Sequence, residues 1–428
     1  MCSLFVRDPR RKAKSRLGGD SKLPLYVYNS LSRKKEKFPR QIKDLKMFVC
    51  GPTVYDYAHL GHARTYIAFD IITRYLKALG YSINYLMNIT DVADKIFERA
   101  KDLNRNPRDL TREFEQAFKD DMKALGVNSI QTYARASDYI PEVIEQINGM
   151  IKKGVAYETE TGVYFEVNRF PKFGALSGLN HEELSLRRLE LCSTKKYPED
   201  FSLWRKQQSG PSWDSPWGPG RPGWHVEDTA ISIQNFGETY DIHGGASELM
   251  FPHHEAEIAQ AESFTGKSPF VKLWLHTGLL RVNGRKMSKS LGNMILVRDT
   301  LKDYSTQELR WYFASFHYRE PVIMSKGSLR KARSELRAFS RNIKPLQNSQ
   351  PTSKPSKSRR LDQLTRRLEH DFRKQMNDDF YTPGALKALS AYAAQVSKIA
   401  RGQTMNDHSR KRANKVCSQL MDILGIGI

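Results

Sequence analysis

Two histidines stand three residues apart in the segment Pro52–His62, which joins an apolar run to an expected helix. His59 and His62 would lie on one face of the opening turn of that helix, where both could donate hydrogen bonds to a polyphosphate as negative charge builds in a transition state. Gly61 allows a nucleotide to approach the backbone closely, and the helix N-terminus offers free N–H groups for phosphate. The alternative, which this short pattern alone favours, is a helix cap with two ordinary surface histidines.

Two lysines have the same spacing in a second segment, Lys286–Ser290, which Gly292 follows closely. Lys286 and Lys289 lie in a run rich in Ser and Gly, so they could close over a triphosphate as compact positive charges. A loop of Lys and Ser can arise by chance. Chance is a poor explanation here, because both segments occur in one chain, in this order, with an expected β-α-β unit between them.

Cys50, His253 and Glu257 have the residue types of a metal site. Cys50 ends an expected strand beside the histidine segment, and His253 and Glu257 lie four residues apart, on one face of an expected helix. That spacing suits two ligands of one metal ion. By spacing alone, two surface residues on a helix are the more common explanation.

The elements that must position these residues follow from the apolar pattern. Strands are expected at 25–28 and 47–49, then a helix over 61–80 with apolar residues at helical spacing, then a strand at 83–87. Strand, turn, helix and strand make a β-α-β unit, which predicts a parallel sheet and an α/β fold.

The rest of the chain divides into longer segments. Residues 95–155 are expected to be largely helical and residues 156–222 to be loop-rich. Residues 346–360 are rich in Ser, Pro, Gln and Lys and are typical of a linker. Residues 361–425 are expected to be wholly helical, with Leu and Ala spaced for packing.

Basic residues gather at both ends of the chain. The 428 residues hold 69 Lys+Arg and 47 Asp+Glu, a net charge of +22. Residues 1–46 contribute +10 (14 basic against 4 acidic) and residues 341–428 another +10 (17 against 7). A nearly neutral body with basic ends suits a polyanionic partner, most simply nucleic acid. The alternative is a pair of solvated basic tails without a partner.

The composition excludes several classes of protein. With 27% charged and 39% hydrophobic residues, the chain is neither disordered nor fibrous, and no stretch approaches the ~20 apolar residues of a membrane span. Four scattered cysteines exclude a disulfide scaffold and suit a reducing compartment. We therefore expect a cytoplasmic protein without a membrane partner. A monomer is also expected, although composition does not determine the oligomeric state.

The two segments resemble the paired signatures of class I aminoacyl-tRNA synthetases, His59-Leu60-Gly61-His62 and Lys286-Met287-Ser288-Lys289-Ser290. Four further runs resemble cysteinyl-tRNA synthetases more narrowly: Cys50–Asp56, Asn88–Asp91, Ser215–His225 and Asp241–Gly245. The resemblance implies a Rossmann-like parallel sheet with an insertion, followed by an α-helical bundle.

The activity that this resemblance implies has two steps. L-cysteine and ATP give cysteinyl-adenylate and pyrophosphate, and the cysteinyl group then passes to the 3′ end of tRNA(Cys). His59, His62, Lys286 and Lys289 would stabilise the phosphate charge, with Mg²⁺ accompanying ATP.

Further residues implied to contact ATP are Thr53, Gly61, Gly244, Gly245, Glu248 and Met287. Those implied to contact cysteine are Cys50, Gly51, Thr90 and Trp224. Ala246 and Glu248 depart from the family, which usually has glycine and aspartate there.

The resemblance also implies a zinc ion held by Cys50, Asp228, His253 and Glu257. Asp228 departs from the family pattern, which has a second cysteine there. Shape alone separates cysteine from serine poorly, whereas zinc that takes a thiolate ligand discriminates by softness. Because aspartate can ligate zinc with the charge of a thiolate, we expect a retained Cys/Asp/His/Glu site. The alternative is a site that has lost its metal or changed its amino acid.

The domains that follow are a basic N-terminal extension (1–24), a catalytic domain (25–340, with an insertion at about 95–222), a linker (346–360) and a tRNA-binding helical bundle (361–428). Because the chain stops at Ile428, the small C-terminal anticodon-reading domain of many family members is not expected.

Two other functions stay open. Relatives of this fold ligate cysteine to the amine of an amino sugar in mycothiol synthesis, but the Cys50–Asp56 run and the basic ends favour tRNA. The second is a non-catalytic RNA-binding paralogue, against which the intact histidines and lysines count.

Overall fold

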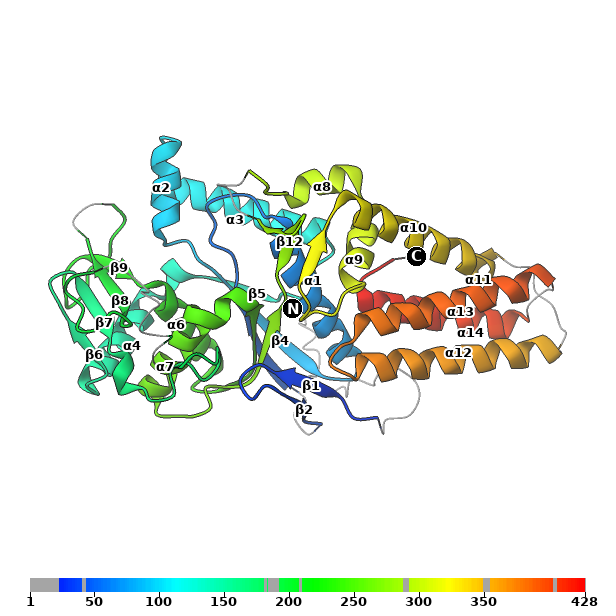
Figure 1. Ribbon diagram of the computed structural model, residues 1–428, viewed down its shortest axis with the longest axis horizontal. Helices are drawn as coiled ribbons and strands as arrows, with labels where there is room; N and C mark the ends of the chain where they lie inside the picture. The colour runs from blue at the N-terminus through cyan, green and yellow to red at the C-terminus, as the bar shows by residue number, and fades with distance from the viewer. Residues whose placement is uncertain are drawn as a thin grey trace, which may run out of the picture.

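The computed structural model describes residues 23–40, 44–180, 183, 192–207, 210–287, 292–348, 355–402 and 406–427. The molecule is elongated, with a central α/β region between a smaller antiparallel sheet at one end and a group of long helices at the other (Figure 1). The expected α/β fold, with a parallel sheet followed by a helical region, is confirmed.

Five strands form the central sheet, and every neighbouring pair is parallel. Across the sheet they are β11 (Val271–Thr277), β10 (Tyr240–Ala246), β3 (Asp44–Val49), β4 (Ser82–Ile89) and β5 (Thr132–Arg135). The order runs outward from β3 to β5 on one side and from β10 to β11 on the other. The winding therefore reverses between β3 and β10, and open α/β sheets bind ligands in the crevice beyond the carboxyl ends of such strands.

Helix α1 (Leu60–Ala78) links β3 to β4 and confirms the expected β-α-β unit. Its apolar residues point in several directions, and Ile67 and Phe69 are fully buried. This pattern is required because strands β4, β10 and β11 contact α1, and so do helices α9 (Thr306–Ala314) and α14 (Asp407–Leu424).

The antiparallel sheet holds four short strands: β6 (Ala156–Glu158), β7 (Gly162–Phe165), β8 (Phe201–Lys206) and β9 (Gly220–Pro222). It occupies residues 156–222, which the sequence predicts to be loop-rich. Strands of three to six residues are too short to give a clear alternation of apolar and polar residues. Phe165, Phe201 and Trp204 are buried in a core of its own. The expected insertion, 95–222, also contains β5, which pairs with β4.

The remaining elements of this part of the chain surround the two sheets. The helices are α2 (Asp94–Asp102), α3 (Pro107–Ala124), α4 (Ile140–Lys152), α6 (Trp224–Phe236), the short turn η4 (Met250–His254), α7 (Glu255–Thr265) and α8 (Val297–Asp303). The outer strands are β1 (Tyr26–Asn29), β2 (Lys34–Lys37), β12 (Leu280–Val282), β13 (Arg285–Lys286) and β14 (Val322–Met324). Within the described ranges, no helix is long and apolar enough to cross a membrane.

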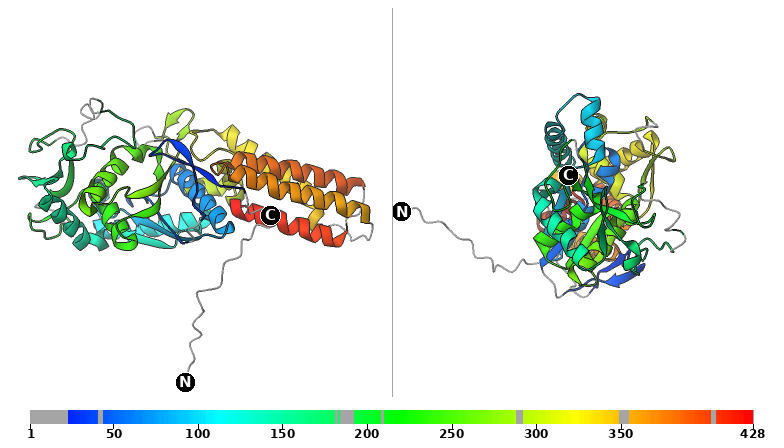
Figure 2. Two further views of the ribbon diagram at one scale, coloured as in Figure 1. Left: turned by 90° about the horizontal axis from the view of Figure 1, so that it is seen from below. Right: turned by 90° about the vertical axis from the view of Figure 1, so that its left-hand side faces the viewer.

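The helical region begins with α10 (Lys326–Ile343) and continues with α11 (Pro345–Asn348), α12 (Pro355–Met376), α13 (Thr382–Gly402) and α14. Helices α12, α13 and α14 lie along one another (Figures 1 and 2). The helical expectation for 361–425 is confirmed where the structure describes it. The expected linker, 346–360, overlaps α11 and the start of α12, and its residues 349–354 lie outside the described residues.

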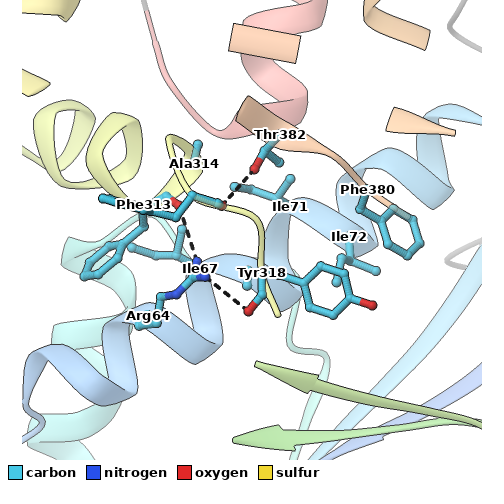
Figure 3. A pocket seen from close by; sticks show the side chains of 11 residues that line it. Arg64, Ile67, Ile71, Ile72, Phe313, Ala314, Tyr318, Phe380 and Thr382 are labelled. Carbon is cyan, nitrogen blue, oxygen red and sulfur yellow. Dashed lines mark hydrogen bonds between the residues drawn. The ribbon is translucent and has the colours of Figure 1, made fainter. Parts of the chain in front are cut away.

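A buried arginine marks the junction between α1 and the helical region. Arg64 donates hydrogen bonds to the backbone carbonyls of Phe313 (3.3 Å) and Tyr318 (3.1 Å), drawn as dashed lines in Figure 3. Phe380 and Thr382, which precede and begin α13, line the same pocket. These carbonyls partner Nη1 and Nη2 of the buried guanidinium, so polar as well as apolar contacts hold α1 to α9 and the loop that follows it.

Candidate active site and metal centre

A cavity of about 780 Å³ opens beyond the carboxyl ends of β3 and β10. Most residues that the sequence assigns to chemistry line it: Cys50, Gly51, Thr53, His59, Gly61, His62, Thr90, Trp224, Asp228, Glu248, His253 and Met287. Segments far apart in the chain therefore meet at the point where the strand order reverses, which is the usual ligand site of such a sheet.

His59 and His62 cap the start of α1. Nδ1 of His59 accepts hydrogen bonds from the backbone N–H groups of Gly61 (3.0 Å) and His62 (3.4 Å), and Nδ1 of His62 accepts from the N–H of His59 (3.3 Å). The two rings stack with centroids 3.8 Å apart. Because both Nδ1 atoms accept, each neutral imidazole carries its proton on Nε2. The helix cap in the alternative is thus confirmed, whereas its surface histidines are not, because burial lowers the pKa of both rings. The cap leaves two Nε2–H groups for a ligand in the cavity.

Burial keeps this histidine pair neutral. It lowers the pKa of His59 to about 4, although Glu248 and Asp56 act in the opposite direction. Burial also lowers the pKa of His62 well below its ordinary value, and His59 adds to that effect. At neutral pH the pair therefore offers uncharged donors, so positive charge for a polyphosphate must come from other groups.

The lysine segment lies beside the histidine pair. Lys286 ends β13 and Met287 lines the cavity, while the side chain of Lys286 and the whole of Lys289 lie outside the described residues. The chain that follows is joined to the start of α1, because Leu60 donates its N–H to the carbonyl of Ile295 at 2.9 Å. The two segments that the sequence assigns to phosphate are therefore neighbours.

Four side chains expected as metal ligands meet at the base of the cavity. Sγ of Cys50 lies 3.3 Å from Oδ2 of Asp228 and 3.9 Å from Oε1 of Glu257. Nε2 of His253 lies 3.1 Å from Oδ2 of Asp228 and 3.0 Å from Oε1 of Glu257. All four residues are buried. Cys50 follows β3, Asp228 lies in α6, and His253 and Glu257 span the start of α7, on one face as their spacing predicts.

The donor set fits a zinc ion. Zn–N, Zn–O and Zn–S bonds of about 2.0–2.3 Å place tetrahedral donors about 3.3–3.8 Å apart, and the four separations scatter around that range. Nδ2 of Asn88 donates to Oδ1 of Asp228 at 2.7 Å, which leaves Oδ2 for a metal. The chain could therefore hold a metal ion here with an aspartate in place of a thiolate.

The carboxylates of Asp228 and Glu257 affect the protonation of both Cys50 and His253. Burial raises the pKa of the Cys50 thiol well above its ordinary value, and Glu257 and Asp228 add to the shift. Burial alone would lower the pKa of His253, but the carboxylates of Glu257 and Asp228 outweigh it and raise that pKa to about 10. A bound divalent cation would favour the deprotonated thiol and the neutral imidazole, which are the forms that ligate metals.

An exposed tryptophan lies beside the donor set. Trp224 is 44% exposed and stacks on His253, with ring centroids 4.3 Å apart. Thr90 is buried nearby, at the end of β4. A Cβ atom on Gly51 would lie 1.8 Å from the carbonyl oxygen of Asn88, so only glycine fits between β3 and β4 there. The apolar face of the Trp224 ring therefore lies next to the base of the cavity, which contains the Cys50 thiol.

The glycines expected to contact the nucleotide lie in a strand. Gly244 and Gly245 are part of β10. Ala246, which ends that strand, lines the cavity together with Glu248. A Cβ atom on Gly244 would lie 2.2 Å from the ring of Phe69 in α1, so close contact between α1 and β10 requires glycine. Ala246 and Glu248, the two departures from the family pattern, both border the open cavity.

Sequence reasoning misses the histidines behind the donor set. Nε2 of His243 and Nε2 of His254 lie 3.3 and 3.2 Å from Sγ of Cys50. Five of the chain's 11 histidines gather here: His225, His243, His253, His254 and His276. We call this group the histidine wall. The density of histidine over residues 225–276 is the signal that could have found it. Sequence reasoning also misses the contact of Asn88 with Asp228. Apart from its place in the Asn88–Asp91 run, nothing in the sequence indicates that role.

Known proteins resemble this chain along most of its length. Residues 37–334 match the family model for the tRNA synthetases class I (C) catalytic domain. A cysteine--tRNA ligase of Methanococcus maripaludis (strain C7) is 45% identical over 382 residues, covering 87% of this chain and 80% of that protein. A cysteine--tRNA ligase of Thermoplasma volcanium is 49% identical over 305 residues, covering 71% and 67%.

Solved structures of other tRNA synthetases share the fold. Mycobacterium tuberculosis methionyl-tRNA synthetase in complex with methionyl-adenylate has a TM-score of 0.64 at 15% identity, covering 90% of each chain. The LeuRS of Agrobacterium radiobacter in a ternary complex with tRNA has a TM-score of 0.60 at 11% identity, covering 90% of this chain and 85% of that one. At such identities the likeness concerns the fold alone.

Proposed function

This chain belongs to the cysteine--tRNA ligase family of class I tRNA synthetases, and from that premise we propose how its own residues join L-cysteine to tRNA(Cys). L-cysteine and ATP first give cysteinyl-adenylate and pyrophosphate, and the cysteinyl group then passes to the 3′ end of the tRNA. One observation carries the proposal: a pair of neutral histidine donors and a buried Cys/Asp/His/Glu donor set share one cavity.

The histidine pair and the lysines act on the triphosphate. The Nε2–H groups of His59 and His62 donate to phosphate oxygens as their charge grows in the transition state. Lys286 and Lys289 supply the positive charge that the neutral imidazoles lack, and Mg²⁺ accompanies ATP. No side chain forms a covalent bond to the substrate.

The nucleotide extends along the end of β10. Gly244 and Gly245 are buried in β10 and pack closely against Phe69 and His254, so they position the end of the strand beside the nucleotide. Thr53 borders the nucleotide from the turn after β3. Glu248 accepts hydrogen bonds from the ribose hydroxyls, with one more methylene of reach than the aspartate usual in the family.

Cys50, Asp228, His253 and Glu257 hold a zinc ion in this proposal. When bound there, zinc supplies an affinity for a thiolate sulfur that separates cysteine from serine. Trp224 and Thr90 border the side chain of the amino acid, and Gly51 lines the same part of the cavity. Asn88 keeps Asp228 turned with one oxygen toward the metal.

The helical region contacts the tRNA. Residues 361–428 form the surface that binds it, and residues 341–428 carry a net charge of +10. The basic extension 1–24 adds to this attraction. The protein acts as a monomer in the cytoplasm, a reducing compartment that suits the free thiols of Cys50, Cys192 and Cys417.

Neither alternative function gains support. The similar curated proteins are named cysteine--tRNA ligases, not ligases of amino sugars. The histidine pair of a non-catalytic paralogue would be free to change, whereas here it is intact and lines the cavity.

Cysteine-dependent ATP–pyrophosphate exchange tests these roles. The wild-type chain should exchange with cysteine and not with serine, and His62→Ala should lower kcat/KM by about 100-fold or more. His408→Ala, at an exposed position in α14, is the matched control and should leave the rate unchanged. Full activity of His62→Ala would contradict the proposed role of His62 in binding phosphate. Exchange in the absence of cysteine would show that cysteine is not the amino acid that is activated.

A further inference from the structure

A second large cavity lies beside helix α2, and we call it the α2 cavity. Its volume is about 340 Å³, and its walls come from α2, α3, the end of β5 and the segment that precedes β9. Ligand sites of roughly 300–1,000 Å³ enclose small molecules, so this volume suits a single nucleotide rather than a duplex. Among the described residues, none that is assigned above to catalysis or metal binding lines it.

Helix α2 and the turn before it stand between the two cavities. Lys95 and Arg99, four residues apart in α2, line the catalytic cavity, whereas Phe97 of the same helix lines the α2 cavity. In the turn, Thr90 lines the catalytic cavity and the next residue, Asp91, lines the α2 cavity. A chain-like ligand whose end enters the catalytic cavity can therefore place a neighbouring unit in the α2 cavity.

Two arginines give the α2 cavity positive charge. Arg108 and Arg112 lie four residues apart in α3, both are exposed, and neither forms an ion pair with any residue that the structure describes. The acidic side chains of Glu115 and Asp138 also line the cavity, but both lie within ion-pair distance of Arg135 (2.6 and 3.9 Å). Exposed guanidinium groups at this spacing suit the oxygens of a phosphate group.

A tryptophan gives the α2 cavity a flat aromatic surface. The backbone of Trp213 pairs with that of Gly220 through two hydrogen bonds of 2.7 and 3.0 Å, which hold this residue beside the antiparallel sheet. Bases of single-stranded RNA stack on such rings, whereas bases inside a duplex are not free to do so.

A carboxylate supplies hydrogen-bond acceptors. Oδ1 of Asp91 accepts from the backbone N–H of Ser137 at 2.9 Å, and its Oδ2 accepts from the Ser137 hydroxyl at 2.5 Å. These two bonds fix the carboxylate. Because each of its oxygens can accept a second hydrogen bond, both keep one acceptor position for a ligand.

We propose that the α2 cavity binds one nucleotide of the single-stranded 3′ end of the tRNA, an inference that rests on the proposed function. The base stacks on Trp213, and the phosphate contacts Arg108 and Arg112. Asp91 accepts a hydrogen bond from an amino group of the base. Cytosine offers such a donor at N4, and cytidines precede the terminal adenosine of a tRNA. The α2 cavity thus positions the terminal adenosine, which enters the catalytic cavity on the other side of α2.

Fluorescence of a labelled tRNA tests the stacking without catalysis. Pyrrolocytosine, a fluorescent analogue, replaces in turn each cytidine that precedes the terminal adenosine. The wild-type protein should quench one of these labels, Trp213→Ala should lose that quenching, and Trp213→Phe should keep most of it because a ring remains. Tyr197→Ala, which removes a ring that is 43% exposed outside the cavity, is the matched control and should quench as the wild type does.

Transfer of cysteine to tRNA tests the arginines. Arg112→Ala should raise KM for tRNA by roughly 10-fold, and the plot of log KM against log salt should become shallower by about one, because one phosphate contact is lost. Cysteine-dependent pyrophosphate exchange should stay unchanged. Lys123→Ala removes an exposed charge from the far end of α3, outside the cavity, and should leave both reactions unchanged.

Three results overturn the proposal: equal quenching by the wild type and Trp213→Ala, an unchanged KM for tRNA in Arg112→Ala, and binding of free cytidine monophosphate that depends on Trp213 without quenching of the labelled tRNA. The last result would assign the α2 cavity to a free nucleotide. Quenching that depends on Trp213, in a wild-type protein that transfers no cysteine, would support the α2 cavity and contradict only the proposed function.

Discussion

The backbone at the start of α1 already orients the two histidines that we propose to act on the triphosphate. Backbone N–H groups at the start of α1 occupy both Nδ1 atoms, so the N-cap hydrogen bonds that begin the helix also fix the tautomer of His59 and His62. Burial then keeps both rings neutral. The same contacts that begin the helix thus leave the Nε2–H groups of His59 and His62 as donors at the N-terminus of α1.

Stability should fall as the pH drops from about 6.5 to about 4. The pKa of His59 is lowered from its ordinary 6.5 to about 4, so between these values the unfolded chain binds a proton that the folded chain does not. This contribution is present above pH 6.5 and is lost as pH falls through 4, with a slope of up to about 1.4 kcal/mol per pH unit. Urea unfolding across this range measures it. His59→Asn, which keeps a capping side chain, should have the shallower slope, and equal slopes would refute the shifted pKa.

Asp228 sets the chemistry of the proposed zinc site. Asp228→Asn changes one atom and removes one anionic ligand, so zinc affinity should fall by about 10-fold to 100-fold. Asp228→Cys, which restores the usual family ligand, should retain zinc. Competition with a coloured chelator measures both affinities. Wild-type affinity in Asp228→Asn would mean that this carboxylate is not a ligand.

At the scale of elements, the sequence predicts what is local and misses what depends on pairing across the sheet. The β3–α1–β4 unit follows from apolar spacing, and the four-residue step from His253 to Glu257 correctly places both on one face. The histidine wall is different, because its imidazoles come from α6, β10, η4 and β11. Only the pairing of β10 with β3 and β11, about 200 and 30 residues away in the chain, brings them to Cys50.

A buried ion pair joins three helices and should dominate local stability. Nη2 of Arg310 in α9 lies 2.6 Å from Oδ2 of Asp70 in α1, and its Nε donates to the carbonyl of Leu424 at the end of α14 (2.9 Å). Asp70→Asn leaves a buried guanidinium without its counter-charge, so the free energy of unfolding should fall by about 3 kcal/mol. Asp371→Asn, in an exposed ion pair with Arg367, should cost less than about 1 kcal/mol. Chemical denaturation compares them, and equal losses would argue against the role of this pair.

At the scale of the whole molecule, the helical region extends from one end of the α/β body (Figures 1 and 2). Residues 341–428 carry a net charge of +10. Transfer of cysteine to tRNA should therefore weaken steeply with rising salt, because phosphate contacts release counterions. Cysteine-dependent pyrophosphate exchange, which involves no tRNA, should change little over the same range. Measuring KM for tRNA from about 50 to 200 mM salt checks this. Equal salt dependence of the two reactions would show that the basic ends do not bind tRNA.

The most direct test of the central claim is the transfer of labelled cysteine to total tRNA, with serine as the control amino acid and with or without a zinc chelator. The account predicts charging with cysteine alone, and loss of that charging when zinc is removed. Cysteine-dependent pyrophosphate exchange without any charging of tRNA would contradict the claim that tRNA is the acceptor of the cysteinyl group. Charging that persists in metal-free protein would contradict the role of the Cys/Asp/His/Glu site.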